Sequence, residues 1–467
     1  MENKTYYIIT LGCQMNERDS ENVAGILSDM GYSEATAREN AGIIIVNTCS
    51  VRENADNRFF GILGQLKKIK EKAPETIVGV CGCMMQQQQI VDKVREKYSW
   101  VDLVFGTHNI HMLSELLGNI IAEHRKIVSI LGGSSEIVEG LPSKRMFPFK
   151  AYVDIMHGCN NFCTYCIVPF TRGREISRSP GNIVREIENL VKDGVLEVTL
   201  LGQNVNSYDG QKGVSQTGDA RVGFSELLQM IENVQGLERV RFMTSHPKDL
   251  DDETIAIFGN KNSNLCPGVH LPVQSGSSRI LEAMNRRYTK EDYLLLVEKL
   301  RAANPDIVIT TDFIVGFPGE TEEDFDETID LIEKVRYDSA FTFIYSPRFG
   351  TPAAKSKDQV PEDVKHERFN RMVKRLNEIT LEKNKLYLAR EEEVLVEGVS
   401  KTNAQMLQGR THGGKLVNFP GEVGIAGHTP LGHIARNDSS GAESLIGRIV
   451  PVRIVDVNTF SFIGEMV

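Results

Sequence analysis

The strongest chemical signal in the sequence is a group of three cysteines near the middle of the chain. Cys159, Cys163 and Cys166 follow the spacing C-x3-C-x2-C, with an aromatic residue directly before the last cysteine. Three thiolates can hold a [4Fe–4S] cluster by three of its irons, which leaves the fourth iron open for an outside ligand. Structural zinc usually takes four protein ligands. His157 could complete such a set, although it lies awkwardly close to Cys159, so zinc stays open as the alternative.

Three more cysteines are spread through the first third of the chain, each shortly after an apolar run. Cys13, Cys49 and Cys83 are separated by 36 and 34 residues, about one strand–helix–strand unit. A lone free cysteine is most often a small buried hydrophobe, but three at matching positions predict a second site, for an iron–sulfur cluster or zinc. Cys81 lies closer to its strand than Cys83, so we expect Cys83 to be the ligand. Cys81 and Cys266 are expected to be structural.

The segments around these first cysteines predict a parallel α/β domain. Apolar, β-branched runs alternate with polar, helix-favouring stretches, and this alternation gives a parallel sheet with right-handed crossovers. Loops at the carboxyl ends of parallel strands meet at one edge of the sheet, so the three thiols should lie close together. The expected strands are Tyr6–Leu11, Ile43–Val46 and Ile77–Val80, and the expected helices are Glu17–Met30 and Val51–Glu71.

The central cysteine segment resembles the signature of the radical S-adenosylmethionine (SAM) superfamily. It runs from His157 to Cys166 and follows the strand-like Ala151–Met156. The resemblance implies a partial (β/α)6 barrel, an open iron that binds the amino acid part of SAM, and cleavage of SAM to a 5′-deoxyadenosyl radical. Segments suited to further barrel strands are Glu197–Leu201, Val240–Thr244, Val269–Leu271, Ile307–Ile314 and Ser339–Tyr345, with helix-like stretches such as Ile183–Lys192 and Tyr293–Ala303 between them.

In α/β barrels the chemistry sits at the carboxyl ends of the strands. Polar residues and glycines at those ends could therefore bind SAM. The candidates are Gln203, Asn204, Ser245, Gln274 and Gly316. Asp312, Arg286 and Arg348 are also attractive, but an ordinary ion pair would account for each equally well. No catalytic residue is assigned beyond the cluster ligands.

The last third of the chain predicts a nucleic-acid-binding appendage. Between Lys365 and Arg390 stand eight Lys or Arg residues and three acids, a local charge of +5. Apolar residues recur there at helical spacing, which places the basic residues on the outward face, although such a charge run is as often only a solvated helix surface. Short strands follow, separated by glycines and prolines, and indicate a small OB-like barrel. They are Glu393–Val399, Ala404–Gln408, Leu416–Phe419, Ile449–Val457 and Ser461–Glu465.

The C-terminal segment resembles the TRAM domain of RNA-modifying enzymes, and the whole chain resembles the methylthiotransferases. The motif around the first cysteine of the chain resembles that of the MiaB-type branch and reads Gly12-Cys13-Gln14-Met15-Asn16. Met85 departs from the pattern of that branch, which often has alanine at this position. The expected domains are residues 4–122, an α/β domain with an auxiliary cluster; 145–376, the radical SAM core; and 379–467, the TRAM barrel.

The resemblance implies methylthiolation of C2 of N6-isopentenyl-adenosine at tRNA position 37, with two [4Fe–4S] clusters and SAM as methyl donor and radical source. The implied partners are a tRNA anticodon loop and an external electron donor, and a monomer is expected. Alternatives are a ribosomal protein or threonylcarbamoyl-adenosine tRNA as substrate, or an iron–sulfur regulator that binds RNA without modifying it. The candidate RNA-binding residues are Arg172, Arg174, Arg178, Arg368, Arg371 and Arg375.

Composition sets the remaining bounds. The 467 residues are 41% hydrophobic and 25% charged, which excludes a largely disordered chain. No apolar run approaches the roughly 18 residues of a membrane span, and no signal pattern opens the chain, so a cytoplasmic location is expected. The net charge of −10 argues against a nucleic acid partner unless charge is unevenly distributed. Eight cysteines are too few for a disulfide scaffold.

Overall fold

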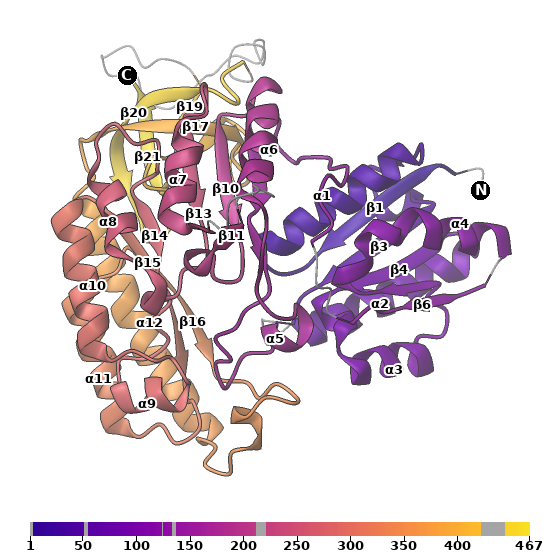
Figure 1. Ribbon diagram of the computed structural model, residues 1–467, viewed down its shortest axis with the longest axis horizontal. Coiled ribbons are helices and arrows are strands. Elements are labelled where there is room, and N and C mark those ends of the chain that lie inside the picture. The colour runs from indigo at the N-terminus through magenta and orange to yellow at the C-terminus, as the bar shows by residue number, and fades with distance from the viewer. Residues whose placement is uncertain (1–2, 51–54, 124, 133–136, 212–220, 422–443) are drawn as a thin grey trace.

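The computed structural model describes residues 3–50, 55–123, 125–132, 137–211, 221–421 and 444–467. Figure 1 shows an N-terminal α/β domain on one side, a helix-covered barrel on the other, and a small C-terminal barrel against one end of the larger one. The N-terminus and the C-terminus lie at opposite sides of the molecule. None of the helices in the described part of the chain combines the length and apolar character that a membrane span requires.

The N-terminal domain is a six-stranded parallel sheet in the order β2-β1-β3-β4-β5-β6. The central strand β3 is buried along its whole length because helices cover both faces. Alternate residues point to opposite faces, so Ile43 and Ile45 pack under α1 and α4, and Ile44 and Val46 pack under α2 and α3. The strands are β1 Thr5–Thr10, β2 Ser33–Glu34, β3 Ile43–Thr48, β4 Ile77–Gly82, β5 Leu103–Phe105 and β6 Ile127–Ser129; the helices are α1 Gln14–Asp29, α2 Ala55–Lys72, α3 Gln88–Lys97 and α4 Leu113–Glu123.

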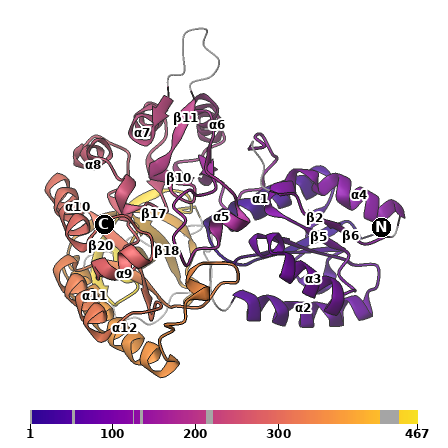
Figure 2. The ribbon, with the colours of Figure 1, turned by 60° about the horizontal axis from the view of Figure 1, so that its bottom comes forward.

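The central domain is a partial parallel barrel, as predicted. Two three-stranded parallel sheets, β7-β10-β13 and β14-β15-β16, are joined by a parallel bridge between Val240 and Leu265. Helices cover the outer surface (Figure 2). The strands are β7 Lys150–Asp154, β10 Glu197–Leu201, β13 Arg239–Phe242, β14 Gly268–His270, β15 Val308–Val315 and β16 Ser339–Ile344. The main helices are α6 Pro180–Lys192, α7 Phe224–Glu232, α8 Asp252–Gly259, α10 Lys290–Ala303, α11 Glu322–Val335 and α12 Glu362–Lys385.

Shorter elements complete this domain near the barrel mouth. The pair β8 and β9 is antiparallel and flanks the cysteine segment, and β11 and β12 form a second antiparallel pair. The bounds are β8 Met156–His157, α5 Val168–Thr171, β9 Ile176–Ser177, β11 Asp209–Gln211, β12 Arg221–Gly223 and α9 Ser278–Ala283.

The C-terminal segment forms a closed barrel in the strand order β17-β18-β19-β21-β20, around a core that includes Phe419 and Phe462. It lies against the amino ends of the larger barrel's strands. There Arg239 donates to the carbonyls of Arg410 and Glu393, and Lys150 contacts Glu397 at 2.6 Å. The C-terminal barrel therefore covers the end opposite the Cys159 loop. Its strands are β17 Glu391–Val399, β18 Met406–Thr411, β19 Leu416–Pro420, β20 Ile449–Val457 and β21 Phe462–Met466.

The predicted basic helix is confirmed as α12, but not all of its basic residues face outward. Met372, Leu376 and Ile379 pack into the barrel core as expected. The interpretation that the basic residues all face outward is wrong for Lys365 and Arg368, which are buried. Lys365 pairs with Glu362, one turn earlier on α12, whereas Arg368 pairs with Glu320 and with Glu322 at the start of α11.

Candidate functional site

The loop after β7 brings Cys159 to the carboxyl end of the barrel. Gly158 has φ +78°, and a Cβ at that position would lie 1.9 Å from the carbonyl oxygen of Arg174. The position therefore requires glycine. The backbone N–H of Cys159 donates to the carbonyl of Gly173 at 3.1 Å. The cysteine loop and residues 173–174 are in direct backbone contact.

The three thiols of this loop are neighbours. Burial raises the pKa of Cys159 to about 11, and the nearby Cys163 adds to the rise. Burial likewise raises the pKa of Cys166 to about 12, with contributions from Cys163 and Cys159. Buried thiols resist ionisation in the bare chain, whereas bound metal deprotonates coordinating thiols outright. Three neighbouring thiols are the donors that a [4Fe–4S] cluster requires, so the donor set fits such a cluster.

The end of α9 holds the cysteine loop from the other side. Arg286 is buried and donates to Cys163 Sγ at 3.6 Å and to the carbonyl of Pro272. Asn285 adopts a left-handed conformation, with φ +60°, and its side chain donates to the carbonyls of Asn161 and Phe162. This segment fixes the loop conformation and places a positive charge beside one thiol.

The predicted SAM-binding residues all lie at the carboxyl end of the barrel. The Gln203 side chain accepts from the N–H of Gly158, and Asn204 bridges the backbone N–H of His246 and the side chain of Asp249. Gln274 follows β14 with φ +77°. Gly316 follows β15 with φ +74°, and its N–H donates to Glu320 at 3.0 Å.

Ser245 and its neighbour His246 have buried polar atoms that suit a ligand. Within the described part of the chain, neither Ser245 Oγ nor His246 Nε2 has a hydrogen-bond partner. Such atoms normally find partners, so each is available for a hydrogen bond to a polar ligand. Burial, together with the nearby Arg286, lowers the pKa of His246 to about 2, which keeps the ring neutral. The candidates drawn from the sequence include Ser245 but not the adjacent His246, which lies four residues after the end of β13.

The N-terminal cysteines meet at the carboxyl edge of their own sheet. Cys13 precedes α1, Cys49 follows β3, and Cys83 begins a short 3-10 helix after β4. A Cβ on Gly12, which has φ +115°, would lie 2.8 Å from Cys49 Sγ. Burial raises the pKa of Cys83 to about 11, with contributions from Cys49 and Cys13 and an opposing effect of Arg172. The three loops converge although they are far apart in sequence.

Asn16 and Asn47 tie these loops together. Asn16 is fully buried, and its side-chain amide donates to the carbonyls of Leu11 and Thr48 at 2.8 and 2.7 Å. Asn47 donates to the carbonyl of Asn16 at 2.8 Å. The asparagine three residues after Cys13 therefore cross-links the first two cysteine loops.

The two remaining cysteines lie elsewhere. Cys81 is fully buried among apolar side chains, including Phe105. Cys266 is buried near Arg241 and Glu197, at the amino ends of the barrel strands. All eight cysteines are in the described residues, and none forms a disulfide.

The spacing of donors bears on the choice between cluster and zinc. Among the described residues, no three His, Cys, Asp or Glu side chains converge tightly enough to hold a single metal ion. Zinc requires its ligands to meet at one point. In a four-iron cluster each thiolate instead binds a different iron, so three cysteines can serve as ligands without meeting at one metal position.

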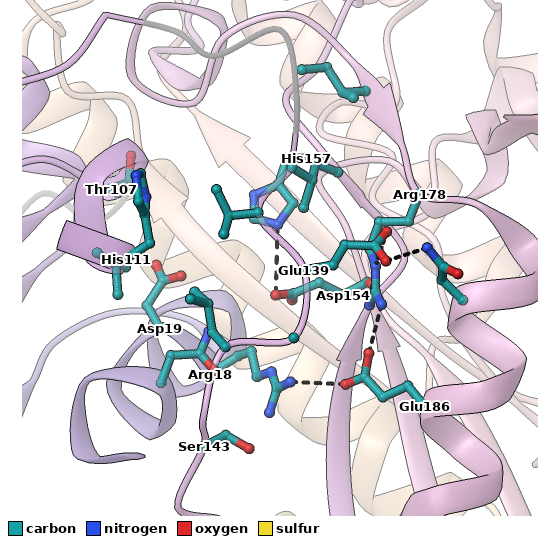
Figure 3. A pocket seen from close by; sticks show the side chains of 18 of the residues that line it. Arg18, Asp19, Thr107, His111, Glu139, Ser143, Asp154, His157, Arg178 and Glu186 are labelled. Atoms are coloured by element: carbon teal, nitrogen blue, oxygen red, sulfur yellow. Dashed lines mark hydrogen bonds and ion pairs between the residues drawn. The ribbon is translucent and has the colours of Figure 1, made fainter. Parts of the chain in front are cut away.

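A cavity of about 570 Å³ lies between the N-terminal domain and the barrel (Figure 3). Ion pairs line it: Arg18 contacts Glu186 at 3.0 Å, and Arg178 contacts Glu139 at 3.1 Å and Glu186 at 2.8 Å. His157 lies 3.7 Å from Asp154. His157 thus has a carboxylate neighbour from the end of β7.

Most of the candidate RNA-binding arginines are paired with carboxylates. Arg172 and Arg178 are buried and bound by carboxylates, Arg172 by Asp19 at 2.6 Å. On α12, Arg368 contacts Glu320 at 2.9 Å, and Arg371 and Arg375 contact acids of α11 and of α12 itself. A phosphate would have to displace those carboxylates. Arg174 is exposed, as Arg371 is, but the contact of its guanidinium is with the ring of Phe162, at 4.3 Å, and not with one of these carboxylates.

Comparisons with known proteins match the three parts of the chain in order. Residues 5–106 match the uncharacterized protein family UPF0004, residues 153–332 the radical SAM superfamily, and residues 385–467 the TRAM domain. A radical SAM methyltransferase from Kitasatospora setae, TsrM, shares the fold with a TM-score of 0.51 at 15% identity, over 75% of this chain and 74% of that one.

Two full-length relatives carry the same name, tRNA-2-methylthio-N(6)-dimethylallyladenosine synthase. The protein from Alkaliphilus oremlandii is 50% identical over 466 residues, covering 100% of this chain and 93% of the relative. The protein from Clostridium perfringens is 52% identical over 467 residues, covering 100% and 98%. The chain therefore belongs to the tRNA-2-methylthio-N(6)-dimethylallyladenosine synthase family of radical SAM methylthiotransferases.

Proposed function

We propose that this protein attaches a methylthio group to C2 of N6-isopentenyl-adenosine at position 37 of tRNA. The full-length relatives are named as synthases of the 2-methylthio nucleoside, and the radical SAM match gives the class of chemistry, with SAM and a [4Fe–4S] cluster. An aromatic C–H is too weak an acid for a side-chain base to deprotonate. The reaction therefore needs hydrogen-atom abstraction, with a sulfur donor held beside the same carbon.

Cys159, Cys163 and Cys166 are the proposed ligands of the radical SAM cluster. When bound, this cluster supplies the electron that cleaves SAM to a 5′-deoxyadenosyl radical. Arg286 holds the loop through Cys163, and the buried, unpartnered oxygen of Ser245 is available to SAM. The other proposed SAM contacts are Gln203, Asn204, Gln274 and Gly316.

Cys13, Cys49 and Cys83 are the proposed ligands of a second [4Fe–4S] cluster, the auxiliary cluster, which would present the sulfur that is transferred. Asn16 fixes the spacing of its loops through the carbonyls of Leu11 and Thr48. The choice of Cys83 over Cys81 is supported by the position of the Cys83 thiol, 3.9 Å from Asn16 Oδ1, whereas Cys81 lies in the apolar core.

One observation carries the proposal: residues 172–174 contact both sets of thiols. Arg172 donates to Cys83 Sγ at 3.3 Å, and the carbonyl of Gly173 accepts from Cys159 N–H at 3.1 Å. A radical formed at one site would therefore arise close to sulfur held at the other. Hydrogen abstraction would not lead to sulfur transfer if the two sites faced different spaces.

The proposed partners are the anticodon loop of tRNA and an external electron donor, with the protein acting as a cytoplasmic monomer. An adenosine in a single-stranded loop can be splayed out of its stack and read on its edges. The TRAM match supports the RNA partner, and exposed Arg174, beside the cysteine loop, is the proposed phosphate contact nearest the site.

The deciding experiment supplies reduced, cluster-loaded protein with SAM and tRNA bearing N6-isopentenyl-adenosine, then analyses the nucleosides by mass spectrometry. We expect the 2-methylthio derivative, and no product from tRNA lacking the isopentenyl group. Product only on threonylcarbamoyl-adenosine tRNA or on a ribosomal protein would reassign the substrate. No 5′-deoxyadenosine under any condition would favour a regulator that binds RNA without modifying it.

A further inference from the structure

Arg172 lies where the two thiol sites meet. It belongs to the barrel domain, between α5 and β9, yet its side chain reaches into the N-terminal domain. The guanidinium is buried and uses two edges: Nε donates to Cys83 Sγ at 3.3 Å, and Nη2 donates to Asp19 at 2.6 Å and Asn16 at 3.1 Å. Asp19 compensates the buried charge, so the arginine can stay beside the thiol.

The residues after Arg172 contact the other thiol site. The carbonyl of Gly173 accepts from Cys159 N–H at 3.1 Å, and the carbonyl of Arg174 lies against Gly158. Any shift of Arg172 relative to Cys83 would therefore pull on the loop that carries Cys159. One short segment holds both sites at a fixed separation.

Arg178 provides an internal comparison. It is also buried, and it lies six residues further along the same stretch of chain. Its guanidinium is held by Glu139, by Glu186 and by the carbonyl of Asp154. The two arginines match in burial and in carboxylate pairing, and differ in that Arg172 is bonded to a proposed ligand sulfur.

We propose that Arg172 is a positioning residue that tunes the auxiliary cluster and fixes its distance from the radical site. This inference rests on the proposed function, in which Cys83 is a cluster ligand. Hydrogen bonds to ligand sulfurs and nearby positive charge favour the reduced, more negative cluster, and such neighbours set reduction potentials. Lysine keeps the charge but lacks the planar fork that binds sulfur and carboxylate together.

The test uses the full-length chain carrying Cys159→Ala, Cys163→Ala and Cys166→Ala, so that only the auxiliary cluster can form. A redox titration followed by electron paramagnetic resonance measures its reduction potential in this parent. Arg172→Lys should lower that potential and change the resonance spectrum, because the N–H to sulfur bond is lost. Arg178→Lys, the matched control, should leave both unchanged.

Asp19→Asn gives a second and opposite expectation. It keeps the bond from Arg172 to Cys83 but removes the compensating negative charge, so the potential should rise. This variant decides the question if Arg172→Lys fails to hold a cluster. Potentials equal to the parent in both variants, or equal shifts in Arg172→Lys and Arg178→Lys, would overturn the inference. A parent without iron would instead overturn the auxiliary site itself.

In the chain with all six proposed ligand cysteines intact, Arg172→Lys should also form more 5′-deoxyadenosine for each methylthiolated nucleoside than the wild type does. If the distance between the two thiol sites varies more, a larger share of the 5′-deoxyadenosyl radicals reacts without sulfur transfer to the nucleoside. An unchanged ratio would overturn the part of the inference that concerns distance.

Discussion

At the scale of single residues, two positions in sequence separate a structural cysteine from a proposed ligand. Cys81 is the penultimate residue of β4 and lies in the apolar core, whereas Cys83 begins the following 3-10 helix, next to Arg172. Cys83→Ala should remove the auxiliary cluster, which iron analysis and electron paramagnetic resonance would detect. Cys81→Ala should keep both clusters and lose about 1 kcal/mol of unfolding free energy, for the sulfur-sized cavity. The reverse pattern would exchange the two assignments.

A second residue-scale prediction concerns the glycine before Cys159. Gly158 and Gly194 both have positive φ, but only Gly158 has a carbonyl where a Cβ would stand, while Gly194 faces open space. Gly194→Ala should cost about 1–2 kcal/mol for the left-handed backbone alone and keep all its iron. Gly158→Ala should in addition displace the cysteine loop and lose the radical SAM cluster. Equal iron contents in the two variants would contradict this account of the loop.

At the scale of elements, the pair α11 and α12 shows why a basic helix need not bind RNA. Arg371 contacts Glu322 at 2.5 Å and Arg375 contacts Glu333 at 2.8 Å, both acids of α11. Exposed pairs of this kind contribute about 0.2–1 kcal/mol each. Arg371→Gln with Arg375→Gln should lower stability slightly and leave the salt dependence of tRNA binding unchanged.

Arg174→Gln is the matched comparison for that double variant. Loss of one phosphate contact reduces the slope of the logarithm of the binding constant against the logarithm of the salt concentration by about one. We expect this reduction for Arg174→Gln. Binding isotherms at several salt concentrations would measure both slopes. A shallower slope in the α12 double variant would mean that this helix supplies phosphate contacts.

The elements themselves were largely predictable, because hydrophobic period and β-branched runs are local signals. Glu197–Leu201 is the strand that was expected, and Ile307–Ile314 is shifted by one residue to Val308–Val315. The burial of Arg368 was not predictable, because its partners Glu320 and Glu322 are about 46 to 48 residues away in sequence. Likewise, spacing alone predicted that Cys13, Cys49 and Cys83 converge, but nothing local linked Arg172 to Cys83.

At the scale of the whole molecule, two separate thiol sites predict additive iron contents. The wild type reconstituted without oxygen should hold about eight irons, four for each three-cysteine site. Changing Cys159, Cys163 and Cys166 together to alanine, or Cys13, Cys49 and Cys83 together, should each leave about four. Zinc in place of iron, or loss of both clusters from either triple variant, would contradict the two-site arrangement.

The C-terminal barrel touches the end of the larger barrel away from the Cys159 loop, through Arg239, Lys150 and their partners. A chain that ends after α12 should therefore keep both clusters and still form 5′-deoxyadenosine from SAM. Its stability should fall, because Arg239 exchanges buried carbonyl partners for water. Because the net charge of the protein is −10, tRNA affinity depends on local surfaces. We expect the C-terminal barrel to provide one of them, so the shortened chain should bind tRNA more weakly. Filter binding beside iron analysis would measure both effects, and wild-type affinity in the shortened chain would place the RNA surface wholly on the first two domains.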